Sequence, residues 1–96
     1  RRALKKANWN VSDVDLFEVN EAFAVVAMAA GKDLSIPSEK LNVWGGAISL
    51  GHPIGASGAR IVVTMMNALK QTGKKKGLAG ICIGGGEATA IAIELL

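Results

Sequence analysis

Cysteine is nearly absent from this chain of 96 residues, in which Cys82 stands alone. One thiol cannot form an internal disulfide, so the fold is not a disulfide scaffold, and such sparing use of cysteine fits a reducing compartment. Aromatic residues make up only 4% of the chain, and the net charge of +3 is mild. No nucleic-acid-binding motif accompanies that charge, so we expect no nucleic-acid partner.

Long hydrophobic runs are also missing, because glycine, proline or charged residues interrupt every apolar stretch before it reaches membrane-spanning length. We therefore expect no membrane partner. Half of the residues are nevertheless hydrophobic, which is typical of a globular chain rather than a disordered one. So short a chain leaves much of its surface exposed, and we expect apolar surface, poor stability and association when it is alone.

The length fits one small domain or a piece of a larger one. The chain begins with Arg1 rather than methionine, no cleavable signal pattern follows, and residues 1–7 have the composition of a helix already under way. We therefore expect residues 1–96 to be a fragment of a longer chain.

Hydrophobic periodicity and turn residues together predict an α/β fold. The second helix is almost entirely apolar, so we expect it to be buried on several sides. Gly31 and Lys32 are expected to end it, and Ser57 is expected to cap the third helix. Three glycines in a row predict a tight turn between the last two strands. The expected order is helix 1–7, strand 15–19, helix 22–30, strand 41–44, helix 59–71, strand 78–83 and strand 88–95. Strands that alternate with helices indicate layers around a mixed sheet, here ending in an antiparallel hairpin.

Polar residues stand at the first strand-to-helix junction, where the sequence reads N-E-A-F-A from Asn20. An asparagine in this position commonly caps the helix, and a cap is the simpler explanation of Asn20. The alternative is that its side-chain amide holds a water or a substrate oxygen. Glu21 also has a simple explanation, because a negative charge interacts favourably with a helix N-terminus.

His52 is the only histidine, and it lies in a glycine-rich stretch over residues 45–58 that reads G-G-A-I-S-L-G-H-P-I-G-A-S-G. A lone histidine is more often structural than catalytic. Here Pro53 restricts the backbone, and the glycines on both sides allow a ligand or another segment to come close. Such a loop holds an imidazole rigidly in a crowded place, which favours a chemical role.

Cys82 precedes three glycines, in C-I-G-G-G over residues 82–86. A free cysteine at the end of a buried strand usually behaves as a small hydrophobe. One or two glycines would satisfy a hairpin turn, so the third indicates a backbone that approaches another group, with N–H groups able to stabilise an oxyanion. From the residues alone, the prediction is a Cys–His hydrolase or transferase with Cys82 as nucleophile and His52 as base.

Taken together, the three motifs resemble the C-terminal signatures of the thiolase family. They occur in the family's order and at family-like intervals, and the resemblance covers essentially the whole chain. The glycine triplet and residues 42–46 look more similar to acetoacetyl-CoA thiolases than to long-chain 3-ketoacyl-CoA thiolases. The family has two similar halves and a loop domain that binds coenzyme A, and this chain resembles most of the second half. It has no match to the family's nucleophilic cysteine, which belongs to the first half.

The resemblance gives Cys82 a different role from that of a nucleophile. It implies a reversible acyl transfer in which two acetyl-CoA give acetoacetyl-CoA and CoA. His52 would take the proton of the nucleophilic cysteine, and His52 with a water held by Asn20 would bind a thioester oxygen. Cys82 would move the proton at the carbon that becomes nucleophilic, and the backbone N–H of Gly84 would contribute to a second oxyanion hole.

The resemblance also implies the surroundings of the reaction. Ala22 and Phe23 would line the channel for the pantetheine arm. Coenzyme A and acyl-CoA would be substrates, with no bound cofactor and no metal. A homo-oligomer, dimeric or tetrameric, is expected for the full-length protein, in the cytoplasm or else in mitochondria or peroxisomes.

Two alternatives remain open, together with one departure from the family pattern. The chain could belong to a thiolase of fatty-acid oxidation that acts on longer 3-ketoacyl-CoA, or it could be a non-catalytic half-domain that binds acyl-CoA or a partner. The departure is Glu87, where the family often has another glycine or a Met-Gly pair. We expect Glu87 to be a surface residue at the start of the last strand. If it pointed into the site instead, its charge would oppose thiolate and enolate formation.

Overall fold

The computed structural model describes all residues, 1–96, and has the α/β architecture that the sequence predicts. Its helices and strands are, in chain order, α1 (Arg2–Ala7), β1 (Leu16–Val19), α2 (Ala24–Leu34), α3 (Ala47–Leu50), α4 (Ser57–Gln71), β2 (Lys76–Ile83) and β3 (Glu87–Glu94). Two short 3₁₀ helices, Val11–Asp13 and Ser38–Lys40, lie in the connections.

The three strands form one mixed sheet in the order β1-β2-β3. β1 pairs with β2 in parallel, with Leu16 opposite Gly77. β2 and β3 form an antiparallel hairpin, with Ile83 opposite Glu87. The expected mixed sheet with a terminal hairpin is therefore confirmed.

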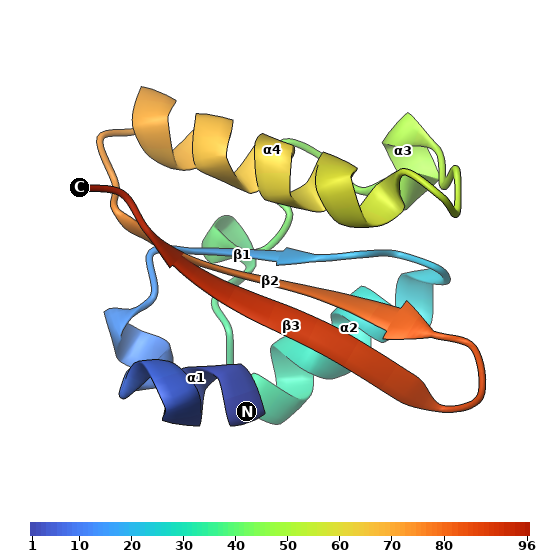
Figure 1. Cartoon of the computed structure of the whole chain (residues 1–96), viewed down its shortest axis with the longest axis horizontal. Helices are drawn as coiled ribbons and strands as arrows, with labels where there is room; N and C mark the ends of the chain where they lie inside the picture. The colour runs from blue at the N-terminus through green and yellow to red at the C-terminus, as the bar shows by residue number, and fades with distance from the viewer.

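Helices cover both faces of the sheet, with α4 on one face and α1 and α2 on the other (Figure 1). Side chains alternate between these faces along each strand, as the pleat of a strand requires. Leu16 thus belongs to the apolar cluster under α4, and its neighbour Phe17 belongs to the cluster on the opposite face. The cluster under α4 consists of Leu16, Ile61, Met65, Ala68, Leu69 and Ala79. The opposite cluster consists of Leu4, Val14, Phe17, Ile36 and Leu78.

The second helix differs from its prediction in length and in burial. It continues through Gly31 and Lys32 to Leu34, and Ser35 ends it in the left-handed conformation with φ 52°. Only Ala27 is buried, whereas the apolar sequence predicts burial on several sides. Its outer positions are exposed large apolar residues, and further ones follow in α3 and the loop after it. The expected apolar surface is therefore present, while poor stability and association remain predictions.

The predicted strand at 41–44 is wrong. Leu41 makes a single parallel bridge to Phe17, and Asn42 then turns away with φ 48°. The side chain of Asn42 takes over the pairing, because its Oδ1 accepts from the Val19 N–H and its Nδ2 donates to the Val19 carbonyl, both at 2.8 Å. An asparagine amide thus replaces the backbone of an adjacent strand residue.

Candidate active site

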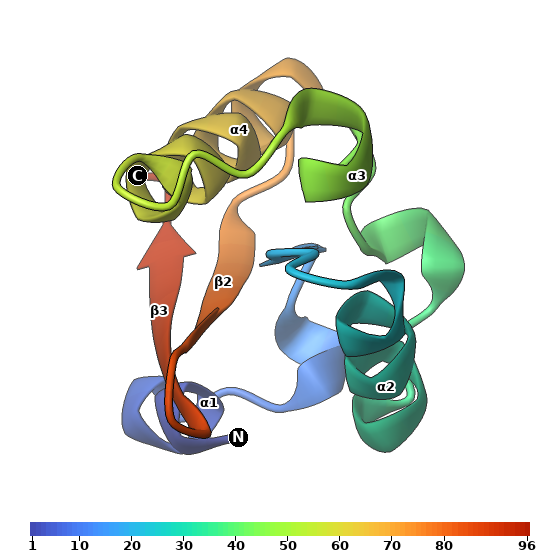
Figure 2. The same ribbon diagram turned by 90° about the vertical axis from the view of Figure 1, so that its right-hand side faces the viewer.

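Three predicted site residues, Asn20, His52 and Cys82, come together at the end of the sheet where β1 and β2 finish. Figure 2 views the molecule from this end, where the loop between α3 and α4 and the turn between β2 and β3 lie in front. Asn20 directly follows β1, Cys82 lies near the end of β2, and His52 lies in the loop between α3 and α4. The carboxyl ends of parallel strands are a common place for ligand sites, because the loops that leave them converge there.

A cleft of about 540 Å³ brings most of these residues together. His52, Cys82 and Gly84 line it, and so does Ala22 from the first motif, between β1 and α2. Its remaining lining residues are apolar or glycine: Ile54, Gly55, Gly58, Ala59, Ile81 and Ile83. One imidazole and one thiol in an apolar cleft are suited to proton transfer next to a bound apolar group.

Asn20 supports this cleft from behind His52. It is fully buried, its backbone N–H donates to Gly80 at 2.9 Å, and its Nδ2 lies 3.4 Å from Nε2 of His52. The capping explanation is wrong, because α2 begins only at Ala24 and has no side-chain cap. Oδ1 of Asn20 is buried without a hydrogen-bond partner. A buried unpaired oxygen is costly, so it marks a place where a water or a substrate group is expected to bind.

His52 is exposed, and its orientation comes from hydrogen bonds. Its Nδ1 lies 2.5 Å from Oγ of Ser57, which in turn donates to the Pro53 carbonyl at 3.1 Å. Ser57 is not the predicted cap, because it is the first residue of α4 and its hydroxyl turns back to the loop. Sequence analysis missed this contact, since spacing alone does not distinguish a cap from a partner for the imidazole.

Cys82 is exposed, although the aliphatic sequence predicts the end of a buried strand. β2 is buried from Gly77 to Ala79, half-buried at Gly80 and Ile81, and exposed at Cys82 and Ile83. Gly85 and Gly86 have φ of 83° and 79°, so these two glycines satisfy the turn. Gly84 is the third, and a Cβ placed there would meet nothing within 4 Å. The open space at Gly84 agrees with a backbone that another group approaches.

Phe23 is the predicted site residue that the structure does not bring to the cleft. Its side chain is 75% exposed and it does not line the pocket that contains Ala22. Glu87 is exposed at the first position of β3, as expected of a surface residue.

A buried ion pair next to the site was not predicted. Arg60 of α4 donates to Glu18 of β1 at 2.9 Å, and Glu18 is only 3% exposed. Burial raises the pKa of Glu18 to about 7, the charge and hydrogen bond of Arg60 oppose this rise, and nearby Glu21 adds to it. The sequence signal for this ion pair was Glu18 itself, a charged residue within an otherwise apolar strand.

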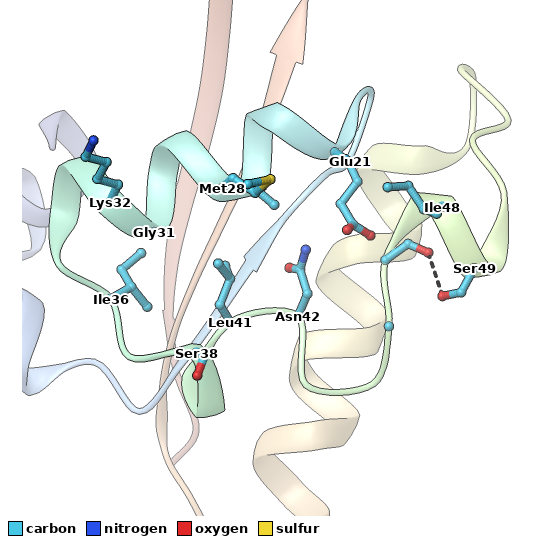
Figure 3. Close-up of a pocket in the computed structure, with 14 residues that line it drawn as sticks. Glu21, Met28, Gly31, Lys32, Ile36, Ser38, Leu41, Asn42, Ile48 and Ser49 are labelled. Atoms are coloured by element: carbon cyan, nitrogen blue, oxygen red, sulfur yellow. Dashed lines mark hydrogen bonds between the residues drawn. The ribbon is translucent and has the colours of Figure 1, made fainter.

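A larger pocket of about 790 Å³ lies elsewhere, between α2 and the segment from Ile36 to Ser49 (Figure 3). It shares no lining residue with the cleft that holds His52 and Cys82. Glu21 extends toward it over Gly46, where a Cβ would lie 1.6 Å from the carboxylate Oε1. We assign the chemistry to the smaller cleft, because only that cleft contains an imidazole and a thiol.

None of the helices combines the length and the apolar character needed to cross a bilayer. No three side chains of the His, Cys, Asp and Glu types gather closely enough to hold a metal ion.

Comparison with known proteins places these features in a family context. The family model described as "Thiolase, C-terminal domain" matches residues 1–95. The acetyl-CoA acetyltransferase of Chromobacterium violaceum is 56% identical over 94 residues, which are 98% of this chain and 24% of that protein. The cytosolic acetyl-CoA acetyltransferase of Mus musculus is 51% identical over the same shares of the two chains.

A solved structure agrees with the sequence matches. The crystal structure of the Bacillus anthracis acetyl-CoA acetyltransferase superposes with a TM-score of 0.93 at 48% identity, over 97% of this chain and 24% of that one. The chain therefore spans about a quarter of the length of the relatives it matches.

Proposed function

The chain belongs to the thiolase family, and from this premise we propose that it supplies one part of the active site of an acetyl-CoA acetyltransferase. The reaction is the reversible condensation of two acetyl-CoA to acetoacetyl-CoA and CoA. The observation that carries the proposal is the cleft that holds His52, Cys82 and Gly84, with Asn20 directly behind the imidazole. Residues 1–96 act in it as part of the C-terminal domain of a longer chain.

In the first step, His52 is the base for a cysteine thiol supplied by the rest of the protein. Nε2 takes the thiol proton, and the thiolate attacks the carbonyl carbon of acetyl-CoA. The C–S bond to coenzyme A then breaks, the departing thiolate takes its proton from water, and His52 keeps the thiol proton on Nε2. The backbone N–H of Gly84, which lines the cleft beside Cys82, stabilises the oxyanion that forms on the carbonyl.

In the second step, Cys82 as thiolate removes a proton from the methyl carbon of a second acetyl-CoA. The enolate oxygen is bound by His52 and by a water that Asn20 holds, for which the unpartnered Oδ1 provides an acceptor. The carbanion attacks the acetyl-enzyme, the new C–C bond forms, and the enzyme thiolate leaves and takes its proton back from Nε2 of His52. Cys82 gives the methyl proton to water and is again a thiolate. A thiol suits this proton transfer because its pKa lies not far above neutrality.

The proposal also covers substrate binding, cofactor use, oligomeric state and compartment. Ala22 at the cleft and exposed Phe23 contact the pantetheine arm of the substrate. The protein uses coenzyme A and acyl-CoA as substrates without a resident cofactor. It works as a homo-oligomer in the cytoplasm, which agrees with the word cytosolic in the name of the mouse relative.

Substitution of Cys82 in the full-length protein tests the proposal. Cys82→Ala is expected to abolish acetoacetyl-CoA synthesis while acetyl-enzyme still forms from acetyl-CoA, because only the second step needs this thiol. Burst-phase release of CoA measures the first step, and acetoacetyl-CoA absorbance measures the second. Normal condensation by Cys82→Ala would refute the role of Cys82.

Chain length of the substrate is the second point to measure. An acetoacetyl-CoA thiolase cleaves acetoacetyl-CoA faster than a long 3-ketoacyl-CoA in the presence of CoA, and we expect this order. The reverse order would assign the protein to fatty-acid oxidation and leave the chemistry of the cleft unchanged.

A further inference from the structure

Ser57 contacts the imidazole of the candidate site but takes no part in the proposed steps. It is the first residue of α4, it is 1% exposed, and its hydroxyl lies against Nδ1 of His52. Building on the proposed function, we infer that Ser57 is a positioning residue that holds His52 in the tautomer with its proton on Nδ1. This tautomer leaves the lone pair on Nε2, where a base is needed.

The hydrogen-bond geometry around Ser57 determines which atom donates. Oγ lies 3.1 Å from the Pro53 carbonyl oxygen and 2.5 Å from Nδ1 of His52. A carbonyl oxygen can only accept, so both contacts of Oγ are hydrogen bonds only when the single hydroxyl proton goes to Pro53. The hydroxyl oxygen must then accept from the ring, and Nδ1 carries the proton.

The second ring nitrogen has a partner that favours the same tautomer. Nδ2 of Asn20 lies 3.4 Å from Nε2 of His52, and an amide NH₂ group can only donate. It therefore faces the lone pair of Nε2 more favourably than it would face an N–H. Both neighbours of the ring thus select one tautomer.

Ser57 is itself held in a fixed place. The Pro53 carbonyl accepts from the backbone N–H of Ala56 at 2.8 Å and of Ser57 at 2.9 Å, as well as from the hydroxyl. One helical turn later, Arg60 pairs with Glu18 on β1 at 2.9 Å. The helix that begins at Ser57 is thereby tied to the strand that leads to Asn20. Because the His52 ring is exposed, these contacts rather than packing determine its orientation.

The inference is tested in the full-length protein with Ser57→Ala and Ser57→Thr. Ser57→Ala is expected to lower kcat for acetoacetyl-CoA synthesis about 10- to 100-fold, the range known for groups that orient metal-bound histidines, with KM unchanged. The acidic limb of its pH–rate profile moves to lower pH, because the imidazolium loses the acceptor of one N–H. Ser57→Thr keeps the hydroxyl and restores most of kcat.

Ser49→Ala is the matched control. Its hydroxyl donates to the Gly46 carbonyl at 3.2 Å within α3 and does not touch His52, so kcat and the pH profile stay as in the wild type. Thermal unfolding of every variant separates lost stability from lost positioning. A kcat loss that Ser49→Ala shares, or that follows the melting temperature, would overturn the inference.

His52→Ala distinguishes this inference from the proposed function on which it rests. If His52→Ala is inactive while Ser57→Ala has wild-type kcat and pH profile, only the role of Ser57 is wrong. If His52→Ala retains full activity, the proposed function itself fails.

Discussion

The two ends of the sheet differ in how completely their groups are satisfied. At the end where β1 and β2 begin, Asp15 accepts from the backbone N–H groups of Lys75 and Lys76 at 3.0 and 2.9 Å, and its own N–H donates back to Lys76 at 2.8 Å. Val14 is fully buried there. Side chain, backbone and core all tie the strands together at this closed end.

At the opposite, open end the same strands leave the core. Cys82 and Ile83 are exposed, and so are the first residues of β3 that pair with them. Oδ1 of Asn20 is buried without a partner, and the imidazole of His52 is held only by hydrogen bonds. One end stabilises the fold, and the other leaves polar groups available for a substrate, at the expense of stability.

Glu18 and Asp15 lie three residues apart, and the free energy of unfolding should depend on pH in opposite directions for their two carboxyl groups. Burial raises the pKa of Glu18 from 4.5 to about 7, so the folded state binds its proton more tightly than the unfolded state does. Stability should fall as pH rises from 4.5 to about 7, by up to about 3 kcal/mol, and then remain level. Glu18→Gln should abolish this fall in urea unfolding followed by circular dichroism.

Asp15 should behave in the opposite way. The Lys76 backbone hydrogen bond lowers its pKa below 3.8, with that of Lys75 also contributing. Its stabilisation is fully present above pH 3.8 and is lost as pH falls through the lower folded value. Asp15→Asn should therefore reduce stability by about 1–2 kcal/mol at neutral pH and flatten the loss in acid. If both carboxyl groups changed the stability in the same direction as pH rises, the comparison would be wrong.

Alanine substitution at two glycines, Gly77 in β2 and Gly84 in the turn after it, compares how closely the two ends of the sheet are packed. A Cβ at Gly77 would lie 2.5 Å from Sδ of Met65 and 2.9 Å from Leu69, whereas a Cβ at Gly84 meets nothing within 4 Å. Gly77→Ala is expected to lower the free energy of unfolding by about 1–3 kcal/mol through overpacking. Gly84→Ala, its matched control, should be nearly neutral in the same urea titration. Equal losses would mean that the open end is as closely packed as the other.

The smallest effect is expected at Glu87, which lies exposed at the open end. Glu87→Gln removes one charge from a solvated position and should change acetoacetyl-CoA synthesis by the full-length protein less than about twofold, because exposed charges interact weakly. A large rise in rate with Glu87→Gln would instead place its carboxylate in the site, against the thiolate of Cys82.

Several features could be predicted because they depend on local patterns. The helix around Ile61 and Met65 has apolar residues at helical spacing, and the structure confirms it as α4. The hairpin follows from glycines that adopt positive φ, and two of the three do so. The meeting of His52 and Cys82 in one cleft agrees with the Cys–His site that the residue types suggested and the family resemblance implied. Each of these signals lies within a short stretch of chain.

Other features depend on which segments meet, and local patterns could not reveal them. Asn42 replaces a strand with its side chain because it lies beside Val19, 23 residues away. Ser57 turns to His52 rather than to its own helix, and Asn20 lies four residues before α2 instead of capping it. Phe23 is exposed because no element of this chain packs over it.

The sequence by itself determined the α/β class, the terminal hairpin and the three motifs that identify the family, because hydrophobic spacing, glycine conformation and motif order act over short distances. Tertiary structure alone decided how the imidazole is held, which carboxyl groups are buried, and which end of the sheet stays open. Those outcomes depend on hydrogen bonds and desolvation between segments tens of residues apart, such as Glu18 with Arg60, and only folding brings such segments together.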